Sequence, residues 1–105
     1  MQQFMLYRNR NPRTRALYPL LLDVQCDLLE GLRTRVVIPL TKKAALTSKP
    51  VSHLMPVIEF EDEAYVLLTP QLAGISHAEL GPPAGSLARQ RDTILAALDF
   101  LLTGF

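Results

Sequence analysis

The sequence predicts a mainly β domain, in which antiparallel strands are followed by one C-terminal α-helix that packs against them. Short runs rich in β-branched and aromatic residues, separated by turn residues, fill roughly the first 80 positions. After residue 85 the apolar residues recur at helical spacing. A length of 105 residues suits one domain with a single modest core. We therefore expect a single domain over 1–105, with a β-rich region over 1–80, a linker 81–85 and a helix 86–103.

The β-rich region divides into runs of high β-propensity. The expected strands cover residues 3–7, 17–24, 34–40, 57–60 and 64–69, with a further short strand around 75–80. The polar stretch 8–15 contains Asn-Pro, a turn signal, and Glu30-Gly31 interrupts the chain before the third strand. Pro19 fits a strand start or an edge position, because proline cannot donate a ladder hydrogen bond. The order of runs indicates an antiparallel sheet or small barrel.

A hairpin is expected where the runs 57–60 and 64–69 flank Glu61, Asp62 and Glu63. The connection has no glycine, which usually supplies the favoured turn geometry. With Glu59 these residues form an acidic cluster. A charge run of this kind indicates a solvated turn rather than a catalytic site.

The C-terminal helix is expected to begin at Ser86, which has the chemistry of an N-cap, after the linker Gly81-Pro82-Pro83-Ala84-Gly85. Gly104 stands where a left-handed residue would end it. One helical face is formed by residues spaced alternately four and three apart: Leu87, Arg91, Ile94, Leu98, Leu101 and Phe105.

The second half of this helix is apolar nearly all round. It contains Ile94, Leu95, Leu98, Phe100, Leu101, Leu102 and Phe105, with Ala96 and Ala97 between them. One sheet covers only an apolar stripe of about 100° on a helix, so the surplus must be buried elsewhere. A symmetric homodimer, the commonest oligomer, would bury it. A deeper monomeric core is the alternative.

Charge and cysteine content restrict the function classes. Residues 1–43 carry eight Lys or Arg against three Asp or Glu, whereas the rest carries three against seven. The net charge of +1 is too small for a dedicated nucleic-acid binder, but the asymmetry suits an acidic partner. The single Cys26 fits a reducing compartment. Without a recognisable signal peptide or an apolar run of about 20 residues, we expect a cytoplasmic protein with no membrane association.

No arrangement of residues typical of catalysis is recognisable. His53 and His77 have no ligand or carboxylate at a motif spacing, and phosphate-loop, metal-ligand and nucleophile motifs are absent from the sequence. Acids flank Cys26 and would raise its pKa, so we expect a buried or inert thiol rather than a nucleophile. We therefore expect a protein that acts by binding, with no catalytic residue, metal or cofactor.

Two segments are candidates for binding. The loop 8–15 holds four arginines, whose forked donors suit the carboxylates of an acidic, partly disordered peptide. A solvated loop is the alternative interpretation. The sequence Thr103-Gly104-Phe105 after the helix is either an ordinary helix stop or an exposed tip with an aromatic ring and a free carboxylate. Such a tip could enter a groove in a partner, and a dimer would present it twice.

Several blocks, in this order along the chain, resemble the CcdB family of toxins. They are Gln3-Phe4, Asp23-Val24-Gln25-Cys26-Asp27-Leu28-Leu29, Arg35-Val36-Val37-Ile38-Pro39-Leu40 and Gly104-Phe105. The resemblance implies an SH3-like barrel with a C-terminal helix, a homodimer, and poisoning of the DNA gyrase A subunit. It also implies neutralisation by the antitoxin CcdA, and repression of the operator DNA by the toxin–antitoxin complex.

Carried over by position, the resemblance assigns two sets of contacts. The gyrase-binding set is Leu28, Leu29, Asp99, Leu102, Thr103, Gly104 and Phe105. The antitoxin-binding set is Arg8, Arg10, Arg13, Arg15, Thr41, Lys42 and Lys43, and the antitoxin overlaps the gyrase surface. Thr103 stands where the best-known family member has tryptophan, and Phe105 where it has isoleucine, so the tip differs in its anchor. Two alternatives stay open: an endoribonuclease like the MazF and Kid toxins, and a non-toxic member that only binds antitoxin.

Overall fold

The computed structural model describes residues 2–29 and 31–104. In these residues, seven strands form one antiparallel sheet. The strands are β1 (Met5–Asn9), β2 (Leu20–Asp23), β3 (Thr34–Lys42), β4 (Val57–Phe60), β5 (Glu63–Leu67), β6 (Ala73–Ser76) and β7 (Leu80–Ser86). The α-helix is α1 (Arg91–Thr103), and the 3-10 turns are η1 (Asp27–Leu29), η2 (Lys43–Ala45), η3 (Thr69–Gln71), η4 (His77–Glu79) and η5 (Ala88–Gln90). The expected mainly β fold with a C-terminal helix is confirmed.

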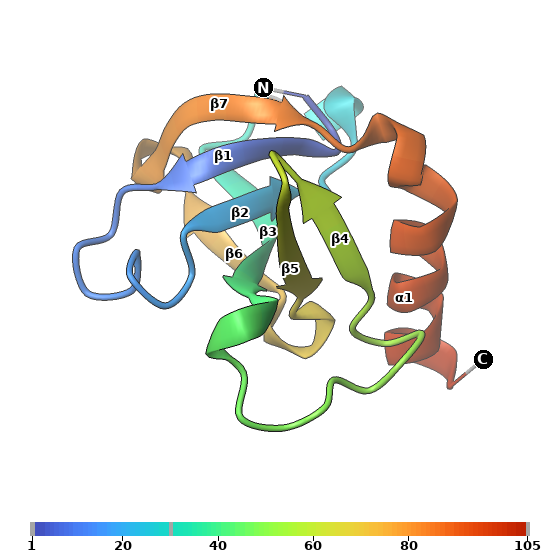
Figure 1. Ribbon diagram of the computed structural model, residues 1–105. Coiled ribbons are helices and arrows are strands. Elements are labelled where there is room, and N and C mark those ends of the chain that lie inside the picture. The colour runs from blue at the N-terminus through green and yellow to red at the C-terminus, as the bar shows by residue number, and fades with distance from the viewer. Residues whose placement is uncertain (1, 30, 105) are drawn as a thin grey trace.

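The long strand β3 curls the sheet, because two different strands pair along one of its edges. Its first half pairs with β6, where Val37 faces Ala73, and its second half pairs with β5, where Leu40 faces Leu67. Six strands follow the order β4-β5-β3-β2-β1-β7, and β6 branches off at β3. The result is a half-barrel with α1 along one side (Figure 1).

Apolar residues lie on both faces of the sheet. On β2, Leu20 and Leu22 join the larger cluster, which also contains Ile94 of α1, whereas Leu21 points to a smaller cluster on the other face. This division follows from the alternation of side chains along a strand. It explains why the run Leu20–Asp23 is buried throughout rather than at every second position.

The expected hairpin is confirmed as β4 and β5, but its turn is shorter than the three residues expected. Glu63 already pairs with Phe60, so only Glu61 and Asp62 connect the strands. Both have left-handed backbone, with φ of 51° and 62°. A two-residue turn with positive φ at both positions matches the twist of a hairpin. The missing glycine therefore did not prevent the tight turn.

The linker expected at 81–85 is wrong, because these residues belong to β7. Proline usually indicates that a run is not a strand, yet β7 is the last strand of the sheet and, among the described residues, pairs with β1 alone. Pro82 and Pro83 are tolerated because β7 is an edge strand and its register with β1 shifts around Pro83, and prolines occur in sheets at edges and at such irregularities. Gly81 permits close contact with β1, since a Cβ there would lie 2.7 Å from the carbonyl oxygen of Arg8.

The helix begins later than expected. Ser86 ends β7, and its Oγ accepts a hydrogen bond from the Ala88 amide at 3.1 Å in the turn that leads into η5, whereas the N-cap of the α-helix is Gln90. The α-helix starts at Arg91, and its expected end is confirmed by Gly104, which has φ of 79°. No helix in the described residues is long and apolar enough to cross a membrane.

The sheet covers much of the apolar surface of α1. Ile94 and Ala97 are fully buried, and Leu95, Leu98, Phe100 and Leu101 are half-buried. Leu102 is 78% exposed. The apolar surplus that the sequence predicts is therefore concentrated at the end of the helix.

Candidate functional site

The end of α1 presents a small, ordered apolar tip. The Gly104 amide donates to the Phe100 carbonyl at 2.9 Å, and the Thr103 Oγ1 donates to the Asp99 carbonyl at 2.7 Å. The first of these bonds satisfies a carbonyl near the helix end, where the last carbonyls have no intrahelical partner. Leu102 projects outward beside them, and Asp99 is exposed one turn earlier. The expected contact Phe105 lies outside the described residues.

The second apolar feature is the turn η1. Leu28 is 91% exposed and Leu29 is 49% exposed, and Leu32 shortly after them is 52% exposed. Three leucines this open within five residues form a cluster, and such a cluster indicates an interaction surface. The sequence-predicted pair Leu28 and Leu29 is therefore available to a partner.

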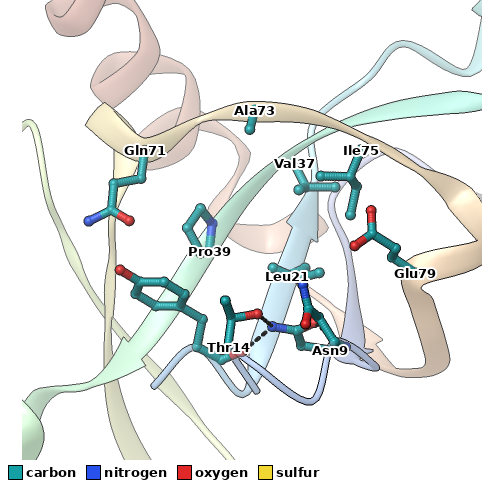
Figure 2. Close-up of a pocket in the computed structure, with 11 residues that line it drawn as sticks. Asn9, Thr14, Leu21, Val37, Pro39, Gln71, Ala73, Ile75 and Glu79 are labelled. Atoms are coloured by element: carbon teal, nitrogen blue, oxygen red, sulfur yellow. Dashed lines mark hydrogen bonds between the residues drawn. The ribbon is translucent and has the colours of Figure 1, made fainter. Parts of the chain in front are cut away.

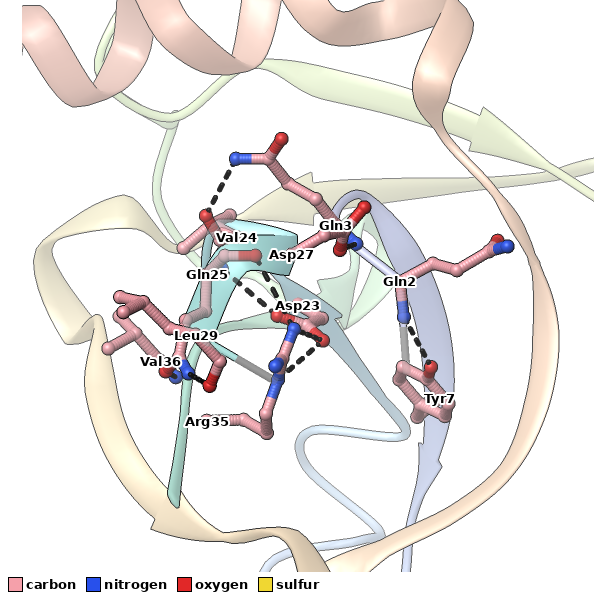
Figure 3. Close-up of polar contacts among 10 residues, drawn as sticks. All are labelled: Gln2, Gln3, Tyr7, Asp23, Val24, Gln25, Asp27, Leu29, Arg35 and Val36. Atoms are coloured by element: carbon pink, nitrogen blue, oxygen red, sulfur yellow. Dashed lines mark hydrogen bonds and ion pairs between the residues drawn. The ribbon is translucent and has the colours of Figure 1, made fainter. Parts of the chain in front are cut away.

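A buried polar cluster holds η1 in place (Figure 3). Asp23 Oδ2 accepts from Arg35 Nη2 at 2.7 Å and from Arg35 Nε at 2.9 Å, and both side chains are completely enclosed. Gln25 extends the cluster toward η1, because its Nε2 donates to the Leu29 carbonyl at 3.0 Å. Its Oε1 accepts from the Val36 amide at 3.0 Å. Gln25 thus ties the exposed leucines to strand β3.

The carboxyl of Asp23 is in an unusual environment for a charged group. Burial raises its pKa above the ordinary value of 3.8, and the hydrogen bond and charge of Arg35 oppose this effect only in part. The Gln25 amide, which donates to Asp23 Oδ1 at 3.0 Å, also favours the ionised form. The charged form of Asp23 therefore bears a desolvation cost, which its counter-ion Arg35 offsets only in part.

One chain does not bring the two apolar features together. The Gln3 amide donates to Asp27 of η1 at 2.7 Å, and the Leu87 amide, shortly before α1, donates to the Phe4 carbonyl at 2.7 Å. The turn η1 therefore lies toward the end of the molecule at which α1 begins, whereas the tip lies at the other end of α1 (Figure 1). A partner that touched both would have to be extended, or the tip and η1 would have to come from different copies of the chain.

The arginine loop is ordered by two asparagines. Asn9 is buried, and its Nδ2 donates to the Thr14 Oγ1 at 3.0 Å and to the Tyr18 carbonyl at 2.9 Å. The Asn11 amide donates to the Asn9 Oδ1 at 3.0 Å. This core of hydrogen bonds leaves side chains on the outside of the loop exposed: Arg10, Arg13 and Arg15.

The loop also borders a hollow of about 230 Å³ on the face of the sheet opposite α1 (Figure 2). Leu21, Val37 and Pro39 lie on the strands beneath it, and Ile75 of β6 lies across from Asn9. The arginines therefore stand beside an apolar hollow rather than on a flat surface.

The remaining predicted cations lie where β3 ends. Lys42 and Lys43 are exposed, but Thr41 is only 1% exposed and its side chain offers no surface to a partner. The acidic turn pairs with two cations of the predicted set. Glu61 Oε1 lies 3.1 Å from Arg8 Nη2, and Glu63 Oε1 lies 3.7 Å from Lys42 Nζ.

Sequence reasoning missed the residues that position these surfaces. Asp23, Gln25 and Arg35 belong to the blocks that carry the family resemblance, but nothing in their spacing shows that they pair. The alternation along β3 places Arg35 on the same face as Val37, a buried residue, and this was the available signal. Cys26 was expected to be buried or inert, and it is exposed.

One known protein family matches nearly the whole chain. The family described as CcdB protein matches residues 3–104. The chain belongs to the CcdB family. As a CcdB-family protein it is the toxin of a toxin–antitoxin pair.

Proposed function

We propose that this CcdB-family toxin binds the DNA gyrase A subunit and holds it in the DNA-cleaved state, without catalysing a reaction. Family membership over nearly the whole chain is the observation that carries the proposal. The family resemblance assigns the gyrase contacts to Leu28, Leu29, Asp99, Leu102, Thr103, Gly104 and Phe105, and all of these except Phe105 lie in the described residues. Preferential binding to one conformation of gyrase raises the population of that conformation.

The exposed leucines support a homodimer as the active form. Leu102 and Leu28 are exposed at 78% and 91%, and each leucine buried at an interface contributes roughly 1.5–3 kcal/mol. In a two-fold dimer the tip of one copy would lie near η1 of the other. The dimer would then present two equivalent tips to the two-fold symmetric gyrase A subunits.

The antitoxin CcdA is proposed to neutralise the toxin by covering the gyrase surface and continuing over the cationic residues. Arg10, Arg13 and Arg15 are exposed and make no ion pair among the described residues, so their donors are available to carboxylates. Lys42 and Lys43 extend the cationic surface. The toxin–antitoxin complex is proposed to repress its own operator.

A supercoiling and cleavage assay with purified gyrase tests the proposal. The wild-type protein should trap cleaved gyrase–DNA complexes, and CcdA should reverse this. Leu102→Gln should weaken trapping at least tenfold, because it removes an apolar side chain from the gyrase surface and weakens the dimer that presents the two tips. A single chain should still fold, since Leu102 is 78% exposed in it. Leu17→Gln is the matched control: Leu17 is 54% exposed and directly follows the arginine loop, so trapping should be unchanged.

Two outcomes would refute the proposal. Wild-type protein that binds CcdA but leaves gyrase untouched would indicate a non-toxic family member. Fragmentation of cellular RNA by the purified protein would indicate an endoribonuclease.

A further inference from the structure

We infer that the loop 46–56 and the start of β4 form a second docking groove for the antitoxin, which accepts an acidic segment with an apolar side chain. The inference rests on the proposed function in that the occupant is the antitoxin. Apart from Lys43 on its rim, the site lies beyond the residues that the family resemblance assigns.

The groove is a hollow of about 240 Å³ that begins where the predicted cations of β3 and η2 end. Lys43 lies on its rim and connects it to the antitoxin surface already proposed. Lys49 and His53 also line it, and all three side chains are exposed. The backbone of His53 has φ of 67°, a left-handed conformation, at the bend where the loop turns back to β4. The groove is therefore continuous with the cationic surface around Lys43.

The charges in the groove favour an acidic occupant. Lys43 and Lys49 make no ion pair among the described residues, whereas the neighbouring Lys42 is paired with Glu63. Within residues 2–29 and 31–104, no acidic side chain lines this hollow. A carboxylate placed between the two lysines would therefore meet cations that have no competing acid.

The floor of the groove is apolar, which selects a peptide over a nucleic acid. Met55 is half-buried, Val57 is 43% exposed, and Pro56 lies between them. A phosphate backbone gains nothing from such a surface, but a leucine or isoleucine side chain would cover it. Met55 adapts to different apolar partners because its thioether chain is flexible.

A second hollow next to the groove indicates which end of the bound segment would lie toward α1. It shares His53 and Pro56 with the first, reaches α1, and is lined there by Asp92, Thr93 and Ala96. Asp92 would repel a carboxylate. The acidic part of the occupant should therefore lie at Lys43 and Lys49, and a neutral or basic part should continue toward the helix.

Calorimetric titration of the full-length toxin with purified CcdA tests the groove. Lys49→Gln and Val57→Thr should each weaken binding about two- to fivefold, the range expected for one exposed ion pair or one apolar contact. Arg33→Gln removes the same charge at the opposite end of β3, and it should leave the affinity unchanged. Gyrase trapping should be the same in Lys49→Gln, Val57→Thr and the wild type.

The outcomes separate the groove from the proposed function. If neither groove variant changes the affinity for CcdA, the inferred groove is refuted and the proposed function still stands. If the wild type does not bind CcdA, the function fails, and a synthetic Glu/Leu peptide then tests the groove through the methyl resonance of Met55. A shift of this resonance that Lys49→Gln abolishes supports an acidic-peptide site. A shift caused instead by a short DNA duplex overturns the inference in favour of nucleic acid.

Discussion

Asp23 and Arg35 show how much of this toxin depends on a few enclosed polar atoms. Their ion pair is sealed from water, and Gln25 connects it to the turn that carries Leu28. Removing one partner of a buried pair leaves an uncompensated charge, which typically costs about 3–5 kcal/mol. Both partners are therefore needed to avoid an unpaired buried charge, even though the attraction between them adds little net stability.

We expect Arg35→Met to lower the free energy of unfolding at pH 7 by about 3–5 kcal/mol, because the buried Asp23 carboxyl loses its counter-ion. Urea unfolding at pH 7 measures the loss, and an unchanged stability would contradict the role of the pair.

The pH dependence of the stability has a definite sign. Because burial raises the folded-state pKa of Asp23 above 3.8, the folded protein binds this proton more tightly than the unfolded chain. The stabilisation from Asp23 is fully present below pH 3.8 and is lost as the pH rises through the folded-state pKa.

Urea unfolding of the wild type and of Asp23→Asn, which cannot ionise at this position, measures this effect between pH 3 and pH 7. The stability of the wild type relative to Asp23→Asn should fall as the pH rises. An advantage that grows with pH would mean that the attraction of Arg35 outweighs burial and that the pKa is lowered.

At the scale of single elements, the sequence predicts those whose signal is local. The run 57–60 matches β4 residue for residue, and Gly104 ends the helix as its position predicts. The sequence did not predict β7, because its prolines are acceptable in a strand only at a sheet edge or an irregularity. Whether a strand lies at an edge depends on how the whole sheet is assembled. The late start of α1 has a similar cause, since β7 occupies the residues up to Ser86.

Gly81 offers a test of the contact between β7 and β1. In Gly81→Ala the new Cβ would lie 2.7 Å from a backbone oxygen of Arg8, which cannot swing aside as a side chain can. We expect a loss of roughly 1–3 kcal/mol in the free energy of unfolding. Gly74→Ala on β6 is the matched control, because a Cβ there meets nothing within 4 Å and should change stability by less than about 0.5 kcal/mol. Equal stability of both variants would contradict the tight β1–β7 contact.

At the scale of the whole molecule, the candidate surfaces were only partly predictable. The arginines and the helix tip stand out in the sequence because charge and helical spacing are local patterns. The burial of Thr41 and the separation of η1 from the helix tip depend on how the sheet curls, which local patterns do not encode. The sequence could name surface residues in this way, but it could not show which of them share one face.

We expect the protein to sediment as a dimer at micromolar concentration. Leu28→Gln combined with Leu102→Gln should shift it toward monomer, since both leucines would lose their burial at the interface. Analytical ultracentrifugation measures the shift, and circular dichroism at the same concentration should show an unchanged fold. A wild-type protein that stays monomeric at about 100 μM would contradict the dimer on which the paired tips depend.

The two prolines of β7 have a consequence for how copies of this toxin meet. An uncapped sheet margin is a template on which another chain can add a strand, which leads to open-ended stacking. Pro82 and Pro83 have no amide hydrogen, and because successive amides along a strand point to opposite sides, one of the two interrupts the row of donors that this margin offers to another strand. Self-association is thereby steered away from this margin and toward side-chain contacts, which can form a closed pair instead of a fibre.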